Sequence, residues 1–595
     1  MNNREVAFYE FGPFRIDMRR YLLLRGDEHI PLSPKTLKTL LVLVERRGSV
    51  VKKDELLAVI WPDSFVEESN LAQNVFVLRK VLGEEKSEHR YIVTVPGVGY
   101  RFVAPVSEVE RVAPPRAAPG ALEETGAVIS IAVLPFKSLS EEGGDAFLGM
   151  GLADALITRL SNLKRVAVRP TTSVMRYGEK TNDPAAIGRE LNVGSVLDGI
   201  FQRGGDQIRV SVQLVRASDG ATLWAAKFDE SFTNIFAIQD SISEQVAVAL
   251  ALKLSGEEQS RLTKNYTENT DAFLLYIRGR YFWNLRTVEG LQKAIVYARQ
   301  AIALDPTYAP AYVGMADSYN LLPGYGGHAP HESFPRAKAA AMQALEIDEA
   351  LAEAYTSLGF VNYRYEWNWT EAERSFRRSI ELKPNYATAH HWYGESLAAA
   401  ARFDESLAML TRARELDPLS LPINTDYAQT LFFTRRFVEC EAHLRETLEM
   451  DERFVRAHIV RGTALEQMGK YEEAAAAFER AAELSGRNPF ALSGLAHVYA
   501  LAGKRRAARE ILKHFEDAAR ERYVSGYNRA VVHIGLGEKE KAIAALEQGV
   551  PSRDVRLVWL DVNPRFDSLR DEPRFTDLLR IVGLRSQRPR RFDNS

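Results

Sequence analysis

A period of about 34 residues dominates the second half of the chain and constrains its fold more than any other feature. Small residues recur with it at intervals of 34 or 35 residues, and one interval is 45: Gly279, Gly314, Gly359, Gly394, Ala428, Gly462, Ala496 and Ala530. The long interval contains the segment Leu322-Pro323-Gly324-Tyr325-Gly326-Gly327. A second series follows the same register: Leu304-Asp305-Pro306, Leu382-Lys383-Pro384 and Leu416-Asp417-Pro418. Since a proline after a helix end starts a turn, the period predicts stacked helix pairs with a small residue at each crossing.

These positions resemble the consensus of tetratricopeptide repeats, most clearly in Tyr471-Glu472-Glu473-Ala474 and in the pairs Ala413 with Pro418 and Ala474 with Ala481. The resemblance implies about eight repeats over residues 268–584 with a C-terminal cap, stacked into a right-handed superhelix whose first helices line a concave face. Candidates for binding a peptide or protein partner in this groove are Tyr319, Phe360, Tyr363, His391, Phe432 and Phe433. The alternative is that several of these side chains form the core between repeats.

The first 104 residues have a different pattern. Short strands are expected at residues 9–16, 21–24 and 28–31, followed by helices at 35–46, 53–61 and 68–82. Two apolar β runs then flank the turn Pro96-Gly97-Val98-Gly99. A hairpin placed directly after an amphipathic helix is the layout of a winged helix, which puts one helix in the DNA major groove and the β-wing on the neighbouring backbone.

This region resembles the C-terminal effector domain of OmpR/PhoB-type response regulators, and still more that of the CadC-like subgroup. The motifs are Leu32-Ser33-Pro34, Glu55-Leu56-Leu57, Trp61-Pro62, Val77-Leu78-Arg79-Lys80 and Pro96 to Phe102. The resemblance implies an effector domain of a phosphorelay family. Two departures from the family stand out: no phosphoacceptor receiver domain precedes it, and no transmembrane helix follows it.

The third predicted helix of this domain has two distinct faces. Leu71, Val75, Leu78 and Leu82 recur at helical spacing and are expected in the core. Asn70, Gln73 and Asn74 lie opposite, and such side chains can bond adenine edges in the major groove. Further DNA contacts are expected from phosphate-binding and wing residues: Ser69, Arg79, Lys80, Gly97, Gly99 and Arg101. The alternative is an ordinary solvated polar face.

Residues 105–127 contain Pro114, Pro115 and Pro119 and predict a semi-extended linker. Residues 128–256 alternate strand and helix patterns, with a helix at 183–191 that Asp183 is expected to cap. Ile131 to Phe136, Gly151-Leu152-Ala153-Asp154 and Leu223-Trp224-Ala225 resemble the N-terminal domain of the TolB-like and FlgO-like group. This resemblance implies an α/β fold without known catalysis.

Composition excludes several classes of protein. The formal net charge is −2, and residues 1–104 are only slightly basic, so any DNA contact must come from a local surface. The single cysteine, Cys440, is expected to be a buried, inert thiol. No catalytic motif, cofactor motif or strong metal set was found: His390 and His391 are adjacent on a helix, and His328 with His331 is a weak metal pair. With neither signal peptide nor membrane span, the expected place is the cytoplasm, without a membrane partner.

The sequence therefore predicts a multidomain chain: a winged helix-turn-helix (α+β), a small α/β domain and an all-α repeat superhelix. We expect a non-enzymatic transcriptional regulator that binds duplex DNA and needs no cofactor. The repeats are expected to bind a partner, and the α/β domain to couple them to the DNA-binding domain. A homodimer on DNA is expected from the family's use of tandem half-sites. The alternatives are a scaffold whose winged helix contacts protein, and an enzyme with an unrecognised α/β site.

Overall fold

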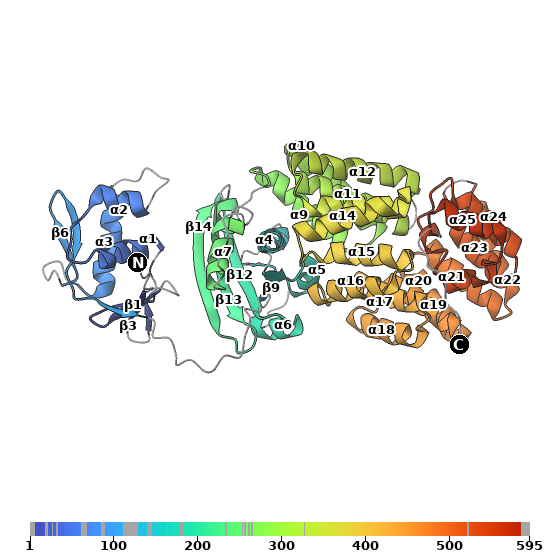
Figure 1. The fold of residues 1–595 in the computed structure, drawn as a ribbon, viewed down its shortest axis with the longest axis horizontal. Helices are drawn as coiled ribbons and strands as arrows, with labels where there is room; N and C mark the ends of the chain where they lie inside the picture. Colours follow the sequence, from blue (N-terminus) through green and yellow to red (C-terminus); the bar gives the residue numbers. More distant parts are fainter. Residues whose placement is uncertain are drawn as a thin grey trace. The chain divides into compact units, whose positions relative to one another are not determined.

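A computed structural model describes residues 6–17, 22–25, 28–30, 32, 34–60, 68–84, 90–110, 129–139, 146–163, 165–178, 183–232, 235–250, 252, 254, 258–259, 262, 266–325, 328–520 and 523–584. The chain forms two compact units, Met1–Thr125 and Gly126–Ser595. Figure 1 shows both units with the labels used below.

The first unit begins with an antiparallel sheet of order β4-β3-β2-β1-β8. Its strands are β1 (Val6–Phe11), β2 (Phe14–Asp17), β3 (Leu22–Arg25), β4 (Glu28–Ile30) and β8 (Ser107–Glu110). The strand predicted at 9–16 is therefore two strands, because the chain turns at Gly12, where φ is +54°. The predicted linker also starts too early: β8 pairs with β1, so the first domain continues to Glu110.

Three helices and a small second sheet complete this unit. The helices α1 (Pro34–Glu45), α2 (Lys53–Ile60) and α3 (Glu68–Leu82) agree with the prediction to within one or two residues. The second sheet has the order β5-β7-β6, with β5 at Val51–Lys52, β6 at Ile92–Val95 and β7 at Gly99–Phe102. Leucine, valine and aromatic side chains from both sheets and all three helices share one core. This is the winged-helix arrangement.

The α/β part of the second unit is built on a mixed sheet of order β11-β9-β12-β13-β14, with β10 also paired to β12. Its strands are β9 (Ile129–Val133), β10 (Lys137–Ser138), β11 (Val166–Val168), β12 (Ser195–Gly204), β13 (Gln207–Arg216) and β14 (Thr222–Ser231). The helices are α4 (Ala146–Leu160), α5 (Thr171–Val174), α6 (Pro184–Glu190) and α7 (Ile235–Ala249). Asp183 caps α6 as predicted, because its carboxylate accepts from the amides of Ala185 and Ala186.

Eight helix pairs follow within the described residues of the second unit, in green to red in Figure 1. Their bounds are α9 (Thr270–Asn284), α10 (Val288–Leu304), α11 (Ala309–Tyr325), α12 (Pro330–Ile347), α13 (Ala352–Val361), α14 (Trp369–Leu382), α15 (Ala387–Ala399), α16 (Phe403–Leu416), α17 (Leu421–Phe433), α18 (Phe437–Met450), α19 (Val455–Gln467), α20 (Tyr471–Leu484), α21 (Pro489–Leu501), α22 (Arg505–Ala518), α23 (Gly526–Gly535) and α24 (Lys539–Gly549).

Several of the periodic glycines lie where the two helices of a pair touch. A Cβ on Gly359 would lie 2.8 Å from Phe376, and one on Gly462 would lie 2.9 Å from Phe478. Bulky side chains of the second helix therefore fill the space left by the small residue of the first. In the long interval, the segment from Leu322 to Tyr325 extends α11 by about a turn.

The chain after α24 folds back onto earlier repeats. It contains the short helices η4 (Leu557–Trp559) and η5 (Pro564–Leu569) and ends with α25 (Pro573–Ile581). The ring of Trp559 stacks on Phe433 with centroids 5.0 Å apart, and the indole of Trp369 donates to the carbonyl of Val582 at 2.8 Å. We call residues 550–584 the C-terminal segment; it joins repeats that are distant in sequence.

Candidate nucleic-acid interface

The helix α3 is fixed by its apolar face. Leu71, Val75, Leu78 and Leu82 are all buried, as their spacing predicts. They pack with α1 and with the aromatic residues of both sheets. The opposite face is therefore held outward, and Asn70, Gln73 and Lys80 are exposed on it.

Asn74 has a different role from the one its sequence pattern suggests. Its Oδ1 accepts a hydrogen bond from the hydroxyl of Thr36 at 3.1 Å, and its Nδ2 donates to Thr39 Oγ1 at 3.1 Å. Both threonines are buried on α1. The Asn74 amide thus joins α1 to α3 and satisfies polar groups inside the domain, so its assignment as a base contact is corrected to a positioning role.

Arg79 is also engaged within the domain. Its Nη2 donates to the carbonyl of Ile92 and to the hydroxyl of Thr94, both at 2.9 Å. These bonds tie the end of α3 to strand β6 of the wing. Arg79 therefore sets the position of the wing relative to α3, and its contact with a phosphate stays a prediction.

Phe76 is a residue that the sequence reasoning missed. Its side chain is 54% exposed, and it follows Gln73 by three residues and precedes Lys80 by four, so these three side chains share one helix face. The available signal was an aromatic residue outside the apolar stripe of α3. A phenylalanine at such a place can contact the methyl group of thymine in the major groove.

The wing is a tight hairpin. The amide of Val98 donates to the carbonyl of Val95 at 3.0 Å, and Gly97 has φ +73°, as the third position of a type II turn requires. A Cβ on Gly99 would lie 2.0 Å from the carbonyl oxygen of Val51, because β5 pairs closely with β7. Both glycines therefore shape the wing.

The other predicted contacts are placed as follows. Arg101 lies on β7, partly buried, and its Nε is buried without a hydrogen-bond partner in the described part of the chain. Val98 is 43% exposed at the wing tip. Ser69 belongs to α3, but its side chain lies outside the described residues, as do the motif residues Trp61 and Pro62.

The aromatic residues predicted for the repeat groove are buried. Tyr319, Tyr363, Phe432 and Phe433 belong to the largest apolar core of the repeats, which corrects their prediction as groove residues in favour of the core alternative. Their rings fill the space between neighbouring helix pairs. Phe360 and His391 are also buried, but both line a cavity inside the repeats.

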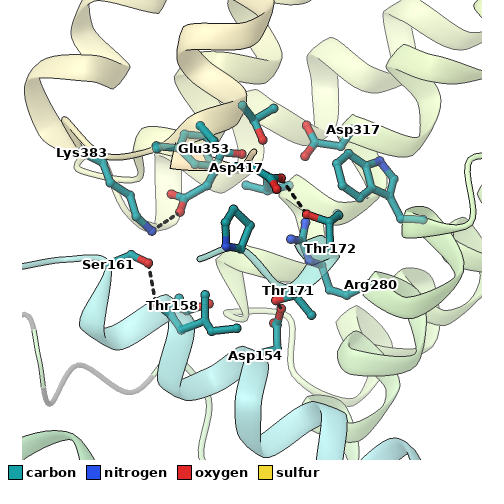
Figure 2. A pocket seen from close by; sticks show the side chains of 18 of the residues that line it. Asp154, Thr158, Ser161, Thr171, Thr172, Arg280, Asp317, Glu353, Lys383 and Asp417 are labelled. Atoms are coloured by element: carbon teal, nitrogen blue, oxygen red, sulfur yellow. Dashed lines mark hydrogen bonds and ion pairs between the residues drawn. The ribbon is translucent and has the colours of Figure 1, made fainter. Parts of the chain in front are cut away.

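The α/β domain is docked on the repeats at a polar junction, shown in Figure 2. A cavity of about 130 Å³ lies there, between α4 and α5 on one side and the first helices of several repeats on the other. Arg169 donates to the carbonyl of Leu416 at 2.9 Å, and Asn385 donates to the carbonyl of Val166 at 3.0 Å. Helix α4 also packs on α9 through Ala155 and Ile277.

The carboxylates around this junction are already bonded. Thr172 donates to Asp417 at 2.9 Å, and Lys383 donates to Glu353 at 2.8 Å (Figure 2). Thr171 donates to Asp154. Burial raises the pKa of Asp417, and its bonds to Ser173 and Thr172 oppose that rise. The cavity therefore has the character of a polar interface between two domains.

Among the described residues, one group could offer three ligands to a metal ion: His391, Glu395 and Asp426. Arg364 donates to Glu395 at 2.8 Å, and Arg456 donates to Asp426 Oδ2 at 3.0 Å. Two guanidinium groups beside the carboxylates oppose the binding of a cation.

No helix of the described chain is long and apolar enough to cross a membrane.

Comparison with known proteins adds family matches for parts of the chain. Residues 26–102 match the family described as transcriptional regulatory protein, C terminal. Residues 127–245 match the second domain of HilA/YgeH-like transcriptional regulators, and residues 465–525 match a tetratricopeptide repeat. The likeness of the α/β domain to the TolB-like and FlgO-like group stays a prediction.

Three relatives are informative. The transcriptional regulator HilA of Salmonella typhimurium is 26% identical over 399 residues, 67% of this chain and 68% of its own length. The transcriptional activator CadC of Escherichia coli is 31% identical over 83 residues, 14% of this chain and 16% of its own. A putative adenylate cyclase 3 of Rhizobium meliloti is 29% identical over 187 residues, 31% of this chain and 32% of its own. The chain is thus a DNA-binding transcriptional regulator in its domain composition, with an OmpR/PhoB-type winged helix, a HilA-like regulator domain and tetratricopeptide repeats.

Proposed function

We propose that this chain regulates transcription by placing the exposed face of α3 in the major groove of duplex DNA. The observation that carries the proposal is the outward face of α3, where Asn70, Gln73, Phe76 and Lys80 are exposed beside the wing. Asn70 and Gln73 would bond adenine edges, and Phe76 would contact a thymine methyl. Lys80, Ser69 and Arg101 would bind phosphates.

The proposed domains follow from the contacts. The DNA-binding domain ends after β8 at Glu110, since that strand completes its first sheet. The α/β domain and the repeats act together as one signal-receiving body, because Arg169 and Asn385 join them through hydrogen bonds. We further propose that the protein is not an enzyme and that it acts in the cytoplasm without a membrane partner. Two copies are proposed to pair on tandem half-sites of the DNA.

The test uses the first unit, residues 1–125, which has its own core. Its affinity for a selected DNA site is measured at two salt concentrations and is expected to fall steeply with salt, because bound phosphates release counterions. Gln73→Ala and Phe76→Ala should lower the preference for the site, by roughly 1–3 kcal/mol per lost base contact. Lys80→Ala should weaken all sequences alike and lower the salt slope by about one.

Arg15→Ala is the matched control, since Arg15 is an exposed arginine on the N-terminal sheet, paired with Glu10. It should leave the affinity for DNA unchanged. Absence of DNA binding at low salt would favour the second candidate, a scaffold whose winged helix contacts protein. Cell fractionation with a tagged chain checks the proposed location: recovery in salt-washed membranes would contradict it.

A further inference from the structure

A cavity of about 710 Å³ lies among the repeats. Its walls include Tyr325 of α11, Trp392 of α15, Arg456 of α19 and Phe490 of α21, and the C-terminal segment adds Trp559. The side-chain amide of Asn488 donates to the carbonyl of Tyr325 at 2.9 Å and joins repeats 163 residues apart in sequence. Cavities of this volume hold small organic ligands.

The wall of this cavity is rich in arginine. Five arginines line it, against the two carboxylates Glu395 and Asp451: Arg286, Arg364, Arg453, Arg456 and Arg556. Glu395 accepts from Arg364 at 2.8 Å and from Arg456 at 3.4 Å. Asp426, next to the cavity, accepts from Arg456 and is bonded to His391. Arg364 and Arg456 are thus paired with nearby carboxylates.

Arg286 and Arg556 have no carboxylate partner among the described residues. The guanidinium of Arg286 lies 3.6 Å above the ring of Trp283, and that of Arg556 lies over Phe490. The Nε of Arg556 is buried and has no hydrogen-bond partner in the part of the chain that the structure describes. Burial lowers the pKa of the Arg556 guanidinium well below its usual value, and the neighbouring Arg456 and Arg364 add to this. A buried charge of this kind is stabilised by a negative partner.

Aromatic rings also line the cavity. Phe360 and Trp392 pack with ring centroids 4.5 Å apart, and Phe490 and Trp559 line the same cavity. Such rings bury flat apolar groups well. The wall therefore offers stacking surface and unmatched positive charge side by side.

We propose that this cavity binds a small organic anion, an aromatic body carrying a phosphate, sulfonate or carboxylate group. Arg286 and Arg556 bind the anionic group, and the aromatic wall holds the ring. The pairs of Arg364 with Glu395 and of Arg456 with Asp426 keep the wall in place. This site is independent of the DNA contacts of α3.

The test titrates the full chain with two fluorescent probes that share their rings: anilinonaphthalene sulfonate, and phenylnaphthylamine, which lacks the sulfonate. Saturable binding of one sulfonate probe per chain is expected, with the neutral probe at least roughly tenfold weaker, the effect of a charge-assisted hydrogen bond. Arg556→Gln and Arg286→Gln should each weaken the sulfonate probe by a similar factor and leave the neutral probe unchanged.

Arg506→Gln is the matched control, because Arg506 is 95% exposed on α22. It should bind both probes as the unchanged chain does. Arg556→Lys guards against loss of folding, since it keeps the charge and should retain most of the sulfonate binding. Unchanged sulfonate affinity in both glutamine variants, or equal affinity for the two probes, would overturn the proposal. Competition by benzoate and by inorganic phosphate then separates ring recognition from anion recognition.

Discussion

Burial in the repeats changes the pKa values of single side chains from those they have in water. Cys440 on α18 is fully buried. Burial raises the pKa of its thiol to about 12 and the nearby Glu441 adds to this. Since the thiolate is the nucleophile, a cysteine in this environment is unreactive.

Cys440 should therefore resist alkylation by iodoacetamide at pH 8 in the folded chain and react completely in denaturant. Because it is the single cysteine of the sequence, the labelled fraction reports the opening of its own repeat. Rapid labelling of the native chain would contradict the buried position of Cys440 on α18.

His443, one turn after Cys440, makes the same repeat sensitive to acid. Burial, with a smaller contribution from the charge of Arg414, lowers the pKa of its imidazole from 6.5 to about 4. Between these values the unfolded chain binds a proton that the folded chain does not. The contribution of His443 to stability is thus complete above about pH 6.5 and is lost as the pH falls towards 4.

We expect the urea concentration needed to expose Cys440 to decrease when the pH is lowered from 7 to 4.5. His443→Gln should remove on the order of 2 kcal/mol of this loss, by the usual conversion of a pKa difference to free energy. His514→Gln is the control, because that imidazole is exposed on α22. An equal pH dependence in the two variants would exclude His443 as the cause.

At the scale of elements, the sequence could predict what depends on local pattern. The helix at 68–82 has the predicted bounds, since its apolar spacing and its polar face are both local. The strand β8 was missed because Ser107-Glu108-Val109-Glu110 is defined by backbone bonds to β1, about a hundred residues earlier. Asn74 was misassigned for a related reason: polarity on a helix does not reveal that Thr36 and Thr39 lie opposite.

The corrected role of Asn74 makes a prediction that separates it from Gln73. Asn74→Ala should destabilise the unit 1–125 by about 1–3 kcal/mol, because it removes the amide that bonds two buried threonine hydroxyls and joins α1 to α3. Gln73→Ala should change stability by less than about 0.5 kcal/mol, as exposed substitutions do. Urea unfolding measures both, and comparable losses would refute the assigned roles.

At the scale of the whole molecule, the junction between the α/β domain and the repeats decides how the chain can be divided. A cut after Thr125 separates two units with separate cores. A cut after residue 267 removes α9, and with it the Ile277 side chain that packs on α4. It also removes Asp417, the acceptor for Thr172 and Ser173.

Residues 1–125 should therefore be monomeric in solution and still bind DNA. Residues 1–267 should aggregate or expose a protease-sensitive α/β domain. Limited proteolysis and size-exclusion chromatography measure this difference. A 1–267 fragment that is as resistant as the full chain would show that the junction contributes little to the α/β fold. The 1–125 fragment then tests whether the α/β domain and the repeats together carry the regulatory signal.

The return of the C-terminal segment to earlier repeats has a consequence for biogenesis. Arrays of repeats can fold one unit at a time, as each emerges from the ribosome, because contacts are between neighbours. Here the indole of Trp369 in the third pair can donate its hydrogen bond only after Val582, 213 residues later, has been synthesised. The third pair therefore lacks this bond until Val582 has been synthesised, and the fifth pair lacks the ring of Trp559 on Phe433 until the C-terminal segment has emerged.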